Sequence, residues 1–217
     1  MHLAFPKKSI RLTSLNGVPI GQATDTLKAL SKVRIGGEIL QENGQLFADY
    51  NGVLEAKIFD KDVQRNTLGN DGITENGELL ILNFTTLGET IFNGKATVDN
   101  GFFEFEFVVP RDIQIPVGLG RVNFYSQKNN ELENQTGYNL DLKVGGLNEN
   151  APEDNEGPLI QLFMNDESFV SGGITNDSPF LIAKLQDDNG INTASGIGHD
   201  ITAILDGDEA NPFVLNE

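Results

Sequence analysis

Alternating apolar and polar residues mark the chain, and the clearest example is the segment 102–109. Its sequence, Phe-Phe-Glu-Phe-Glu-Phe-Val-Val, places Phe103, Phe105 and Phe107 on one face of a strand and Glu104 and Glu106 on the other. One packed face and one face in water are typical of an antiparallel sheet. The pattern therefore predicts a strand with an aromatic inner face.

Similar segments recur at short intervals through the first part of the chain. They predict strands at 9–15, 32–40, 52–59, 78–84, 90–98, 121–126 and 138–144. Asn-Gly pairs, among them 93–94 and 100–101, stand between them, and the pair at 100–101 joins two strong strands directly. We expect a tight hairpin there with left-handed backbone angles. Helical periodicity is weak, and only 25–30 suggests a helical turn, with Asp25 as its cap. The whole pattern predicts an all-β fold, an antiparallel β-sandwich over 1–146.

A polar segment rich in Gly, Pro and acidic residues follows at 147–158 and is interpreted as a linker. Beyond it, strands are expected at 159–164, 180–185, 201–205 and 213–215. Four strands are too few to close a sandwich, so 159–217 is predicted to be a second, truncated Ig-like β domain. Its incompletely covered inward face would consist of Leu159, Leu162, Phe180, Ile182, Ile201 and Ile204.

Charge and composition exclude several classes of function. The 217 residues carry a formal net charge of −17, and the part from 147 onward has 14 acidic residues against one Lys. Such a chain is repelled by phosphate backbones and anionic lipids, so we expect no nucleic-acid partner. No apolar run is long enough to insert into a membrane. The chain has no Cys, which excludes disulfides, thiolate metal sites and a cysteine nucleophile.

Residues for hydrolytic chemistry are scarce. The two histidines are His2, beside the initiator Met, and His199, which follows Ser195 in a Gly-rich turn. No strand–turn–helix motif surrounds Ser195, so a catalytic triad is not supported. No pair of carboxylates stands out for glycoside hydrolysis. We therefore predict no catalytic residue, and His199 is expected to orient a turn by hydrogen bonding.

The acidic segment 187–192, Asp-Asp-Asn-Gly-Ile-Asn, offers hard oxygen donors of the kind that calcium prefers. Its spacing does not fit an EF-hand loop. A different calcium site, formed by Asp187, Asp188 and Asp200, is one interpretation, and a solvated Asx turn between two strands is the other. No other cofactor is expected.

Several short motifs carry a resemblance to a known family. They are Gly157-Pro158, Ser171-Gly172-Gly173, the segment 187–192, Gly196-Ile-Gly-His-Asp-Ile201 and, in the first part, Phe59-Asp-Lys61, Ile91-Phe-Asn-Gly94 and Val109-Pro-Arg-Asp-Ile113. Taken in chain order, these motifs are similar to the region after the peptidase domain in the PorU family, the gingipain-like sortases of the type IX secretion system of Bacteroidetes. The resemblance spans nearly the whole chain.

The resemblance implies a parent protein at the outer membrane, on the extracellular side of the cell surface, that removes C-terminal sorting domains from secreted cargo. The family's catalytic Cys and His belong to a peptidase domain that this sequence does not contain, so this chain would be a non-catalytic portion. Implied partners are the parent's peptidase domain, secretion-system subunits and cargo sorting domains. The alternatives are a bacterial Ig-like adhesive or calcium-binding surface module and, more weakly, a carbohydrate-binding module.

Overall fold

The computed structural model of the chain describes residues 9–22, 26–193 and 200–215. The regular structure of these residues consists of strands, which confirms the predicted all-β fold, and none of them forms a helix that could cross a membrane. The chain divides into two compact units, residues 1–149 with 192–217, and residues 150–191. The domain bounds predicted from the sequence, 1–146, 147–158 and 159–217, stay a prediction.

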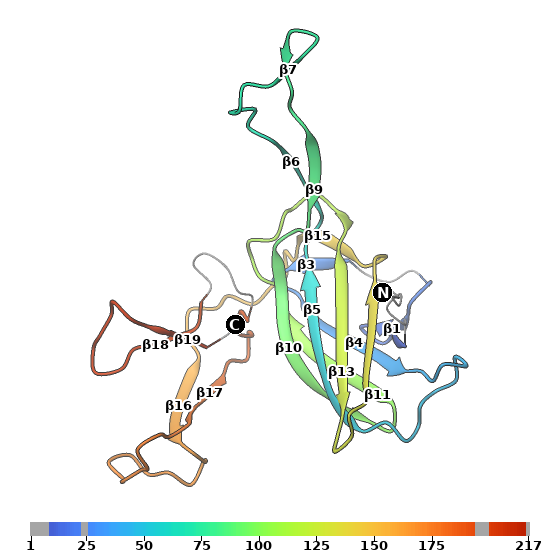
Figure 1. Ribbon diagram of the computed structural model, residues 1–217. Coiled ribbons are helices and arrows are strands. Elements are labelled where there is room, and N and C mark those ends of the chain that lie inside the picture. The colour runs from blue at the N-terminus through green and yellow to red at the C-terminus, as the bar shows by residue number, and fades with distance from the viewer. Residues whose placement is uncertain (1–8, 23–25, 194–199, 216–217) are drawn as a thin grey trace. The chain divides into compact units, whose positions relative to one another are not determined.

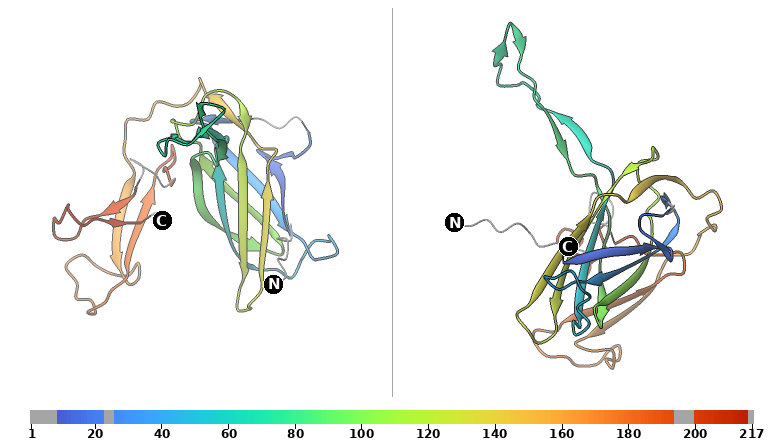
Figure 2. Two further views of the ribbon diagram at one scale, coloured as in Figure 1. Left: turned by 45° about the horizontal axis from the view of Figure 1, so that its top comes forward. Right: turned by 90° about the vertical axis from the view of Figure 1, so that its right-hand side faces the viewer.

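An eight-stranded antiparallel sheet forms the centre of the first unit (Figure 1). The strands follow one another in space as β14-β13-β5-β10-β11-β4-β1-β2. Their bounds are β1 (Ile10–Leu15), β2 (Val18–Pro19), β4 (Lys32–Ile39), β5 (Gly52–Phe59), β10 (Thr90–Asp99), β11 (Phe102–Val108), β13 (Arg121–Lys128) and β14 (Asn134–Asn139). The sheet curls, and near its ends the Ser9 amide donates to the Thr136 carbonyl at 2.9 Å. The antiparallel layers that the sequence predicts are therefore parts of one curled sheet (Figure 2).

Strand β11 has the aromatic inner face that its sequence predicts. Phe103 and Phe107 are buried, whereas Glu104 and Glu106 are exposed. The strand pairs with β4, and Phe103 lies opposite Gly37. A Cβ atom at Gly37 would collide with the Phe103 ring, so the glycine provides the space into which the ring packs.

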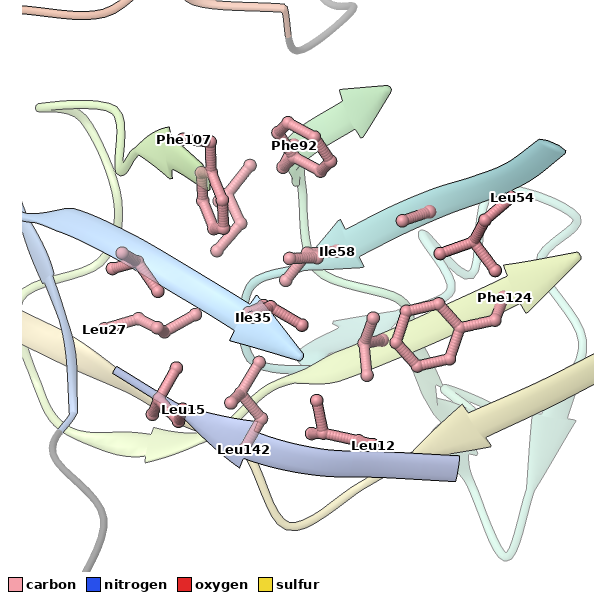
Figure 3. Packing of buried hydrophobic residues seen from close by; sticks show 14 of the residues in the cluster. Leu12, Leu15, Leu27, Ile35, Leu54, Ile58, Phe92, Phe107, Phe124 and Leu142 are labelled. Carbon is pink, nitrogen blue, oxygen red and sulfur yellow. The ribbon is translucent and has the colours of Figure 1, made fainter. Parts of the chain in front are cut away.

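The core lies inside the curl of the sheet, where buried side chains from most of its strands meet (Figure 3). Two close aromatic pairs, Phe92 with Phe107 at 4.5 Å and Phe103 with Phe124 at 5.3 Å between ring centroids, contribute to it. Aliphatic residues fill the remainder. Burying each large side chain contributes roughly 1.5–3 kcal/mol, so this core holds the first unit together. Its labelled members are Leu12, Leu15, Leu27, Ile35, Leu54, Ile58, Phe92, Phe107, Phe124 and Leu142.

The hairpin between β10 and β11 is confirmed. Asn100 and Gly101 have φ angles of 49° and 80°, both in the left-handed region that a tight two-residue turn requires. The Asn-Gly pair at 93–94 behaves differently, because it lies within β10 and forms no turn. A Cβ atom at Gly94 would lie 2.6 Å from the Phe92 ring, so this glycine gives space to an aromatic side chain.

A smaller sheet of three strands, β12 (Gly118–Leu119), β15 (Lys143–Leu147) and β3 (Leu27–Ala29), completes the first unit's core. The helical turn predicted at 25–30 is wrong, because 27–29 is a strand parallel to β15; Asp25, its predicted cap, lies outside the described residues. Leu27 and Ala29 are fully buried and Lys28 between them is half-buried, which is the period of a strand. So short a helix would also be unfavourable to nucleate.

A long hairpin, here called the arm (residues 63–86), continues β5 and β10 beyond the sheet (Figures 1 and 2). Strand β6 (Val63–Asn66) pairs with β9 (Asn83–Thr86), and β7 (Thr74–Glu75) pairs with β8 (Glu78–Leu79) near the tip. The strand predicted at 78–84 thus divides between β8 and β9 and belongs to the arm rather than to the main sheet.

The second unit contains one hairpin of regular length, β16 (Leu159–Met164) with β17 (Leu181–Gln186). Two short strands that follow in the chain, β18 (Thr202–Ala203) and β19 (Phe213–Val214), pair with each other and belong to the first unit. The apolar residues Leu159, Leu162 and Phe180 are exposed. The Ig-like character of this part of the chain stays a prediction.

Candidate functional site

The predicted calcium loop begins where β17 ends. The Asn189 amide donates to Asp187 Oδ1 at 2.8 Å, and the Gly190 amide donates to the Asp187 carbonyl at 3.3 Å. Gly190 has a φ of 93°, which an L residue rarely adopts. This geometry is an Asx turn, one of the two interpretations that the sequence allows.

Asp187 and Asp188 also line an acidic cavity of about 460 Å³ within the second unit. Glu153, Asp154 and Glu156 line it as well. In the ranges 9–22, 26–193 and 200–215, however, no three His, Asp or Glu side chains gather closely enough to hold a metal ion. The calcium site therefore stays a prediction.

Asp200, the third predicted ligand, is exposed just before β18. His2, Ser195 and His199 lie outside the described residues, so the turn-orienting role of His199 also stays a prediction.

A buried ion pair lies at the base of the arm, and it was not predicted from the sequence. Lys61 Nζ lies 2.6 Å from Asp60 Oδ1, and the two side chains are only 12% and 3% exposed. The ammonium also donates to the carbonyls of Gln114, at 2.8 Å, and Val144, at 3.2 Å. The second carboxylate oxygen of Asp60 accepts the Gln114 amide at 2.8 Å.

Lys61 Nζ and Asp60 Oδ2 have partners in the loop before β12 or in β15, so the pair fixes the base of the arm to the rest of the first unit. The space is tight, because a Cβ atom at Gly118 would lie 2.6 Å from the Lys61 side chain. Such a saturated ion pair has no free group to offer a substrate. Its role is structural.

Charged side chains on the outer face of β4 and β11 pair with one another. Glu106 accepts from Arg34 Nε at 2.8 Å and lies 3.0 Å from Lys32 Nζ. Hydrogen bonds from these two cations lower the pKa of Glu106. The same contact raises the pKa of Arg34. A carboxylate with a lowered pKa is a poor general acid or base at neutral pH. These ion pairs, here called the ion-pair ladder (Lys32, Arg34 and Glu106), therefore stabilise the sheet and do not transfer protons.

A larger polar cavity of about 980 Å³ lies between the loops that follow β4 and β13. Phe47 forms part of its wall, and Lys128 Nζ lies 5.0 Å from the centre of that ring. Lys128 is also paired with Glu131 at 3.1 Å and Glu133 at 3.6 Å, and the hydrogen bond that it donates to Glu131 raises its pKa. A cation held this way is not an activated nucleophile.

The Tyr50 hydroxyl packs into the same region. It is buried without a hydrogen-bond partner in the part of the chain that the structure describes, and burial raises its pKa. Its ring packs edge-on against Phe47, with 5.5 Å between ring centroids. A phenol with a raised pKa stays neutral at physiological pH, so Tyr50 is a core residue rather than a base.

Comparison with known proteins finds a similar solved structure. No protein-family model matches the chain, and no curated protein matches it. The crystal structure of dimeric latent PorU from Porphyromonas gingivalis is similar over 97% of this chain, with a TM-score of 0.62 and 30% sequence identity. The chain is related to a region of PorU. The match spans 20% of the PorU chain, so this sequence corresponds to about one fifth of that protein's length.

The similarity to PorU confirms the resemblance that the sequence motifs indicate. Among those motifs, Phe59-Asp-Lys61 contains the buried ion pair. The segment at 91–94 lies in β10, where Ile91 and Phe92 are buried in the core. These two motifs of the first unit therefore contribute packing and anchoring residues.

Proposed function

We propose that the chain is a non-catalytic β region of a sortase-like protein of the type IX secretion system. The observation that carries the proposal is the match to PorU, at 30% identity over nearly the whole chain. The parent would be a gingipain-family cysteine peptidase that processes the C-terminal sorting domains of cargo on the outer face of the outer membrane. Because this sequence has no Cys, the nucleophile of such a peptidase would come from elsewhere in the parent.

The role that suits this region is positioning. A continuous apolar core and a buried ion pair fix the curled sheet and the base of the arm as one rigid body. Rigid sheets commonly carry binding segments on their loops and hairpins. The partners that fit this role are the parent's peptidase domain and, beyond it, secretion-system subunits or cargo sorting domains.

An activity assay tests the non-catalytic part of the proposal. The purified chain is incubated with a peptide from a cargo sorting domain, beside the His199→Ala variant and an active gingipain-type peptidase. We expect cleavage by the peptidase alone. Cleavage by the chain that disappears in the His199→Ala variant would overturn the proposal.

A second candidate function is an Ig-like surface adhesive or calcium-binding module. The observation that favours it is the acidic cavity beside Asp187 and Asp188. Calcium ions commonly stiffen acidic loops of extracellular modules. A rise in the unfolding temperature on adding calcium separates this candidate from a purely structural acidic turn.

A further inference from the structure

The outer face of strands β10, β5 and β13 differs in charge from the chain as a whole. These strands lie side by side in the main sheet (Figure 1). On this face their paired positions carry three cations, Lys57, Lys95 and Arg121, and one acidic residue, Glu55. The chain has 32 acidic residues against 15 basic ones, so a local excess of cations marks this face as a distinct surface.

The register of the strands places the three cations on one diagonal line. Lys95 lies opposite Glu55 on β5, and Arg121 lies opposite Phe59. Glu55 and Phe59 stand two residues to either side of Lys57 along β5, so each cation is a diagonal neighbour of the next. Diagonal neighbours on one face of a sheet are about 7–8 Å apart. The line of cations is here called the basic stripe (Lys95, Lys57 and Arg121).

Two members of the basic stripe have no carboxylate partner. Lys57 Nζ lies 6.0 Å from the centre of the Phe59 ring. Arg121 lies 5.9 Å from the centre of the Tyr138 ring, and its Nε donates to Asn123 Oδ1 at 2.8 Å. Among the residues that the structure describes, neither cation pairs with an acidic side chain. In the ion-pair ladder, by contrast, both cations are paired with a glutamate.

The third member of the stripe is available to a partner as well. Lys95 pairs with Glu55 at 3.1 Å, and the two side chains are 70% and 52% exposed. So exposed a pair contributes little to stability, and Lys95 can exchange Glu55 for another carboxylate at small cost. Tyr125, opposite Glu55 on β13, is also exposed and adds aromatic surface beside the stripe. Tyr and Arg are enriched in protein interfaces.

The spacing of the stripe indicates the form of its partner. Alternate residues of an extended peptide face the same side and lie about 6.8 Å apart. This distance is close to one diagonal step of the stripe, and the long Lys and Arg side chains absorb the difference. Acidic residues at every second position of an extended segment would therefore each meet one cation. In about 0.1 M salt charges farther away than roughly 10 Å are screened, so the stripe outweighs the net charge of the chain.

We infer that the basic stripe binds an extended acidic segment of another protein, in which Asp or Glu occupies every second position. A second copy of this chain is a poor match, because no stretch of the sequence has acidic residues at three alternate positions. The inference goes beyond the proposed function. The stripe would bind such a segment whether or not the parent protein is a sortase, so a binding assay with no secretion step tests the stripe alone.

Three variants of the full chain separate the stripe from net charge and from folding. Lys57→Gln with Arg121→Gln removes the two cations that have no carboxylate partner. Lys57→Arg with Arg121→Lys keeps both charges at the same positions. The matched control is Arg111→Gln with Lys143→Gln, which removes two exposed cations outside this face and changes the net charge equally. Thermal unfolding of each variant verifies that it folds.

The probe is a fluorescent, end-capped peptide of about ten residues in which glutamate and threonine alternate, and its binding is followed by anisotropy. We expect the chain, the charge-keeping variant and the control to bind it at least about fivefold more tightly than the Lys57→Gln, Arg121→Gln variant. Binding should weaken between roughly 0.05 and 0.5 M salt. Equal binding by all four proteins, or binding by none, overturns the inference.

A second peptide tests the spacing. It has the same composition, with all glutamates in one run followed by all threonines, so that successive carboxylates point to opposite sides of an extended chain. The chain should bind it more weakly than the alternating peptide. Equal affinity for the two peptides would mean that the stripe attracts negative charge without regard to its spacing, and would contradict the assignment to a segment with alternating acidic residues.

Two measurements test the other occupants. In the first, an oligosaccharide that contains glucuronate competes with the alternating peptide at equal concentration of carboxylate, and stronger displacement by the sugar than by unlabelled peptide would assign the stripe to an acidic glycan and overturn the inference. The second is sedimentation velocity of the four proteins. Self-association that is lost only in the Lys57→Gln, Arg121→Gln variant would show that a second copy occupies the stripe, and would overturn the inference too.

Discussion

Replacing Lys61 by Met tests the role given to the buried ion pair. Met keeps the apolar stem of the side chain and removes the ammonium, so three acceptors lose a donor: Asp60 Oδ1 and the carbonyls of Gln114 and Val144. Leaving one member of a buried ion pair without its partner costs about 3–5 kcal/mol. Asp60 keeps two backbone donors, the amides of Lys61 and Gln114, so the lower end of this range applies.

The expected loss of about 3 kcal/mol corresponds to a fall in unfolding temperature of roughly 6–12 °C for a chain of this size. The assay is thermal unfolding followed by circular dichroism. The matched control is Lys95→Met, which breaks a 3.1 Å ion pair with Glu55 from a side chain that is 70% exposed, and should cost no more than about 1 kcal/mol. Adding Asp60→Asn to Lys61→Met should recover part of the loss, because the unpaired buried charge is then removed. The reasoning is refuted if Lys61→Met costs no more than the control.

Three further predictions concern the sheet and the acidic loop. Gly37→Ala should clearly lower the unfolding temperature, because the new methyl group collides with the Phe103 ring. Thermal unfolding followed by circular dichroism measures this fall. The pKa of Glu106 is lowered in the folded state, so its ionised form stabilises the fold fully above the ordinary pKa of 4.5, and this stabilisation is lost as the pH falls through the lowered pKa. Thermal unfolding of the chain and of Glu106→Gln across this pH range measures the effect. The difference in unfolding temperature between the two proteins should disappear in acid. Millimolar calcium should raise the unfolding temperature of the chain, and the double variant Asp187→Asn, Asp188→Asn should abolish that rise.

Each of these has a result that would contradict it. Gly157→Ala is the control for Gly37, since a Cβ atom there meets no other atom within 4 Å, and an equal effect of the two changes would remove the ring-packing explanation. A stability difference for Glu106→Gln that persists unchanged into strong acid would contradict the ion-pair ladder. For calcium, Asp177→Asn is the control, and an equal response in all variants, or none, leaves the turn at Asp187 as an Asx turn alone.

The alternation of β11 and the turn at Asn100 could be predicted because both are local. Phe103 and Glu104 lie on opposite faces because a strand has a period of two residues, and an Asn-Gly pair that directly joins two strands favours the left-handed angles of a two-residue turn. The order of the strands could not be predicted. Strand β5 pairs with β10 and β13, and nothing in the alternation of a strand specifies its neighbours.

The arm shows a second limit of sequence reasoning. The run Leu79-Leu-Ile-Leu82 looks like a strand buried in a core, because an apolar run indicates a strand and carries no information about what covers it. It lies instead on an exposed hairpin.

The ion pair shows a third limit. Asp60 and Lys61 are adjacent in sequence, as charges on a solvated turn commonly are, and their burial depends on Gln114 and Val144 far along the chain. In contrast, the Asx turn at Asp187 is a local feature and was one of the two interpretations that the sequence allowed.

Exchanging the matched region of Porphyromonas gingivalis PorU for this chain tests the central claim most directly, with removal of the C-terminal sorting domain from a secreted cargo as the readout. If the chain is a non-catalytic β region of this kind, the chimera should process the cargo, and a chimera carrying an unrelated β domain of the same length should not. A chimera that folds and reaches the cell surface, yet leaves the cargo as unprocessed as the unrelated domain does, would contradict the account.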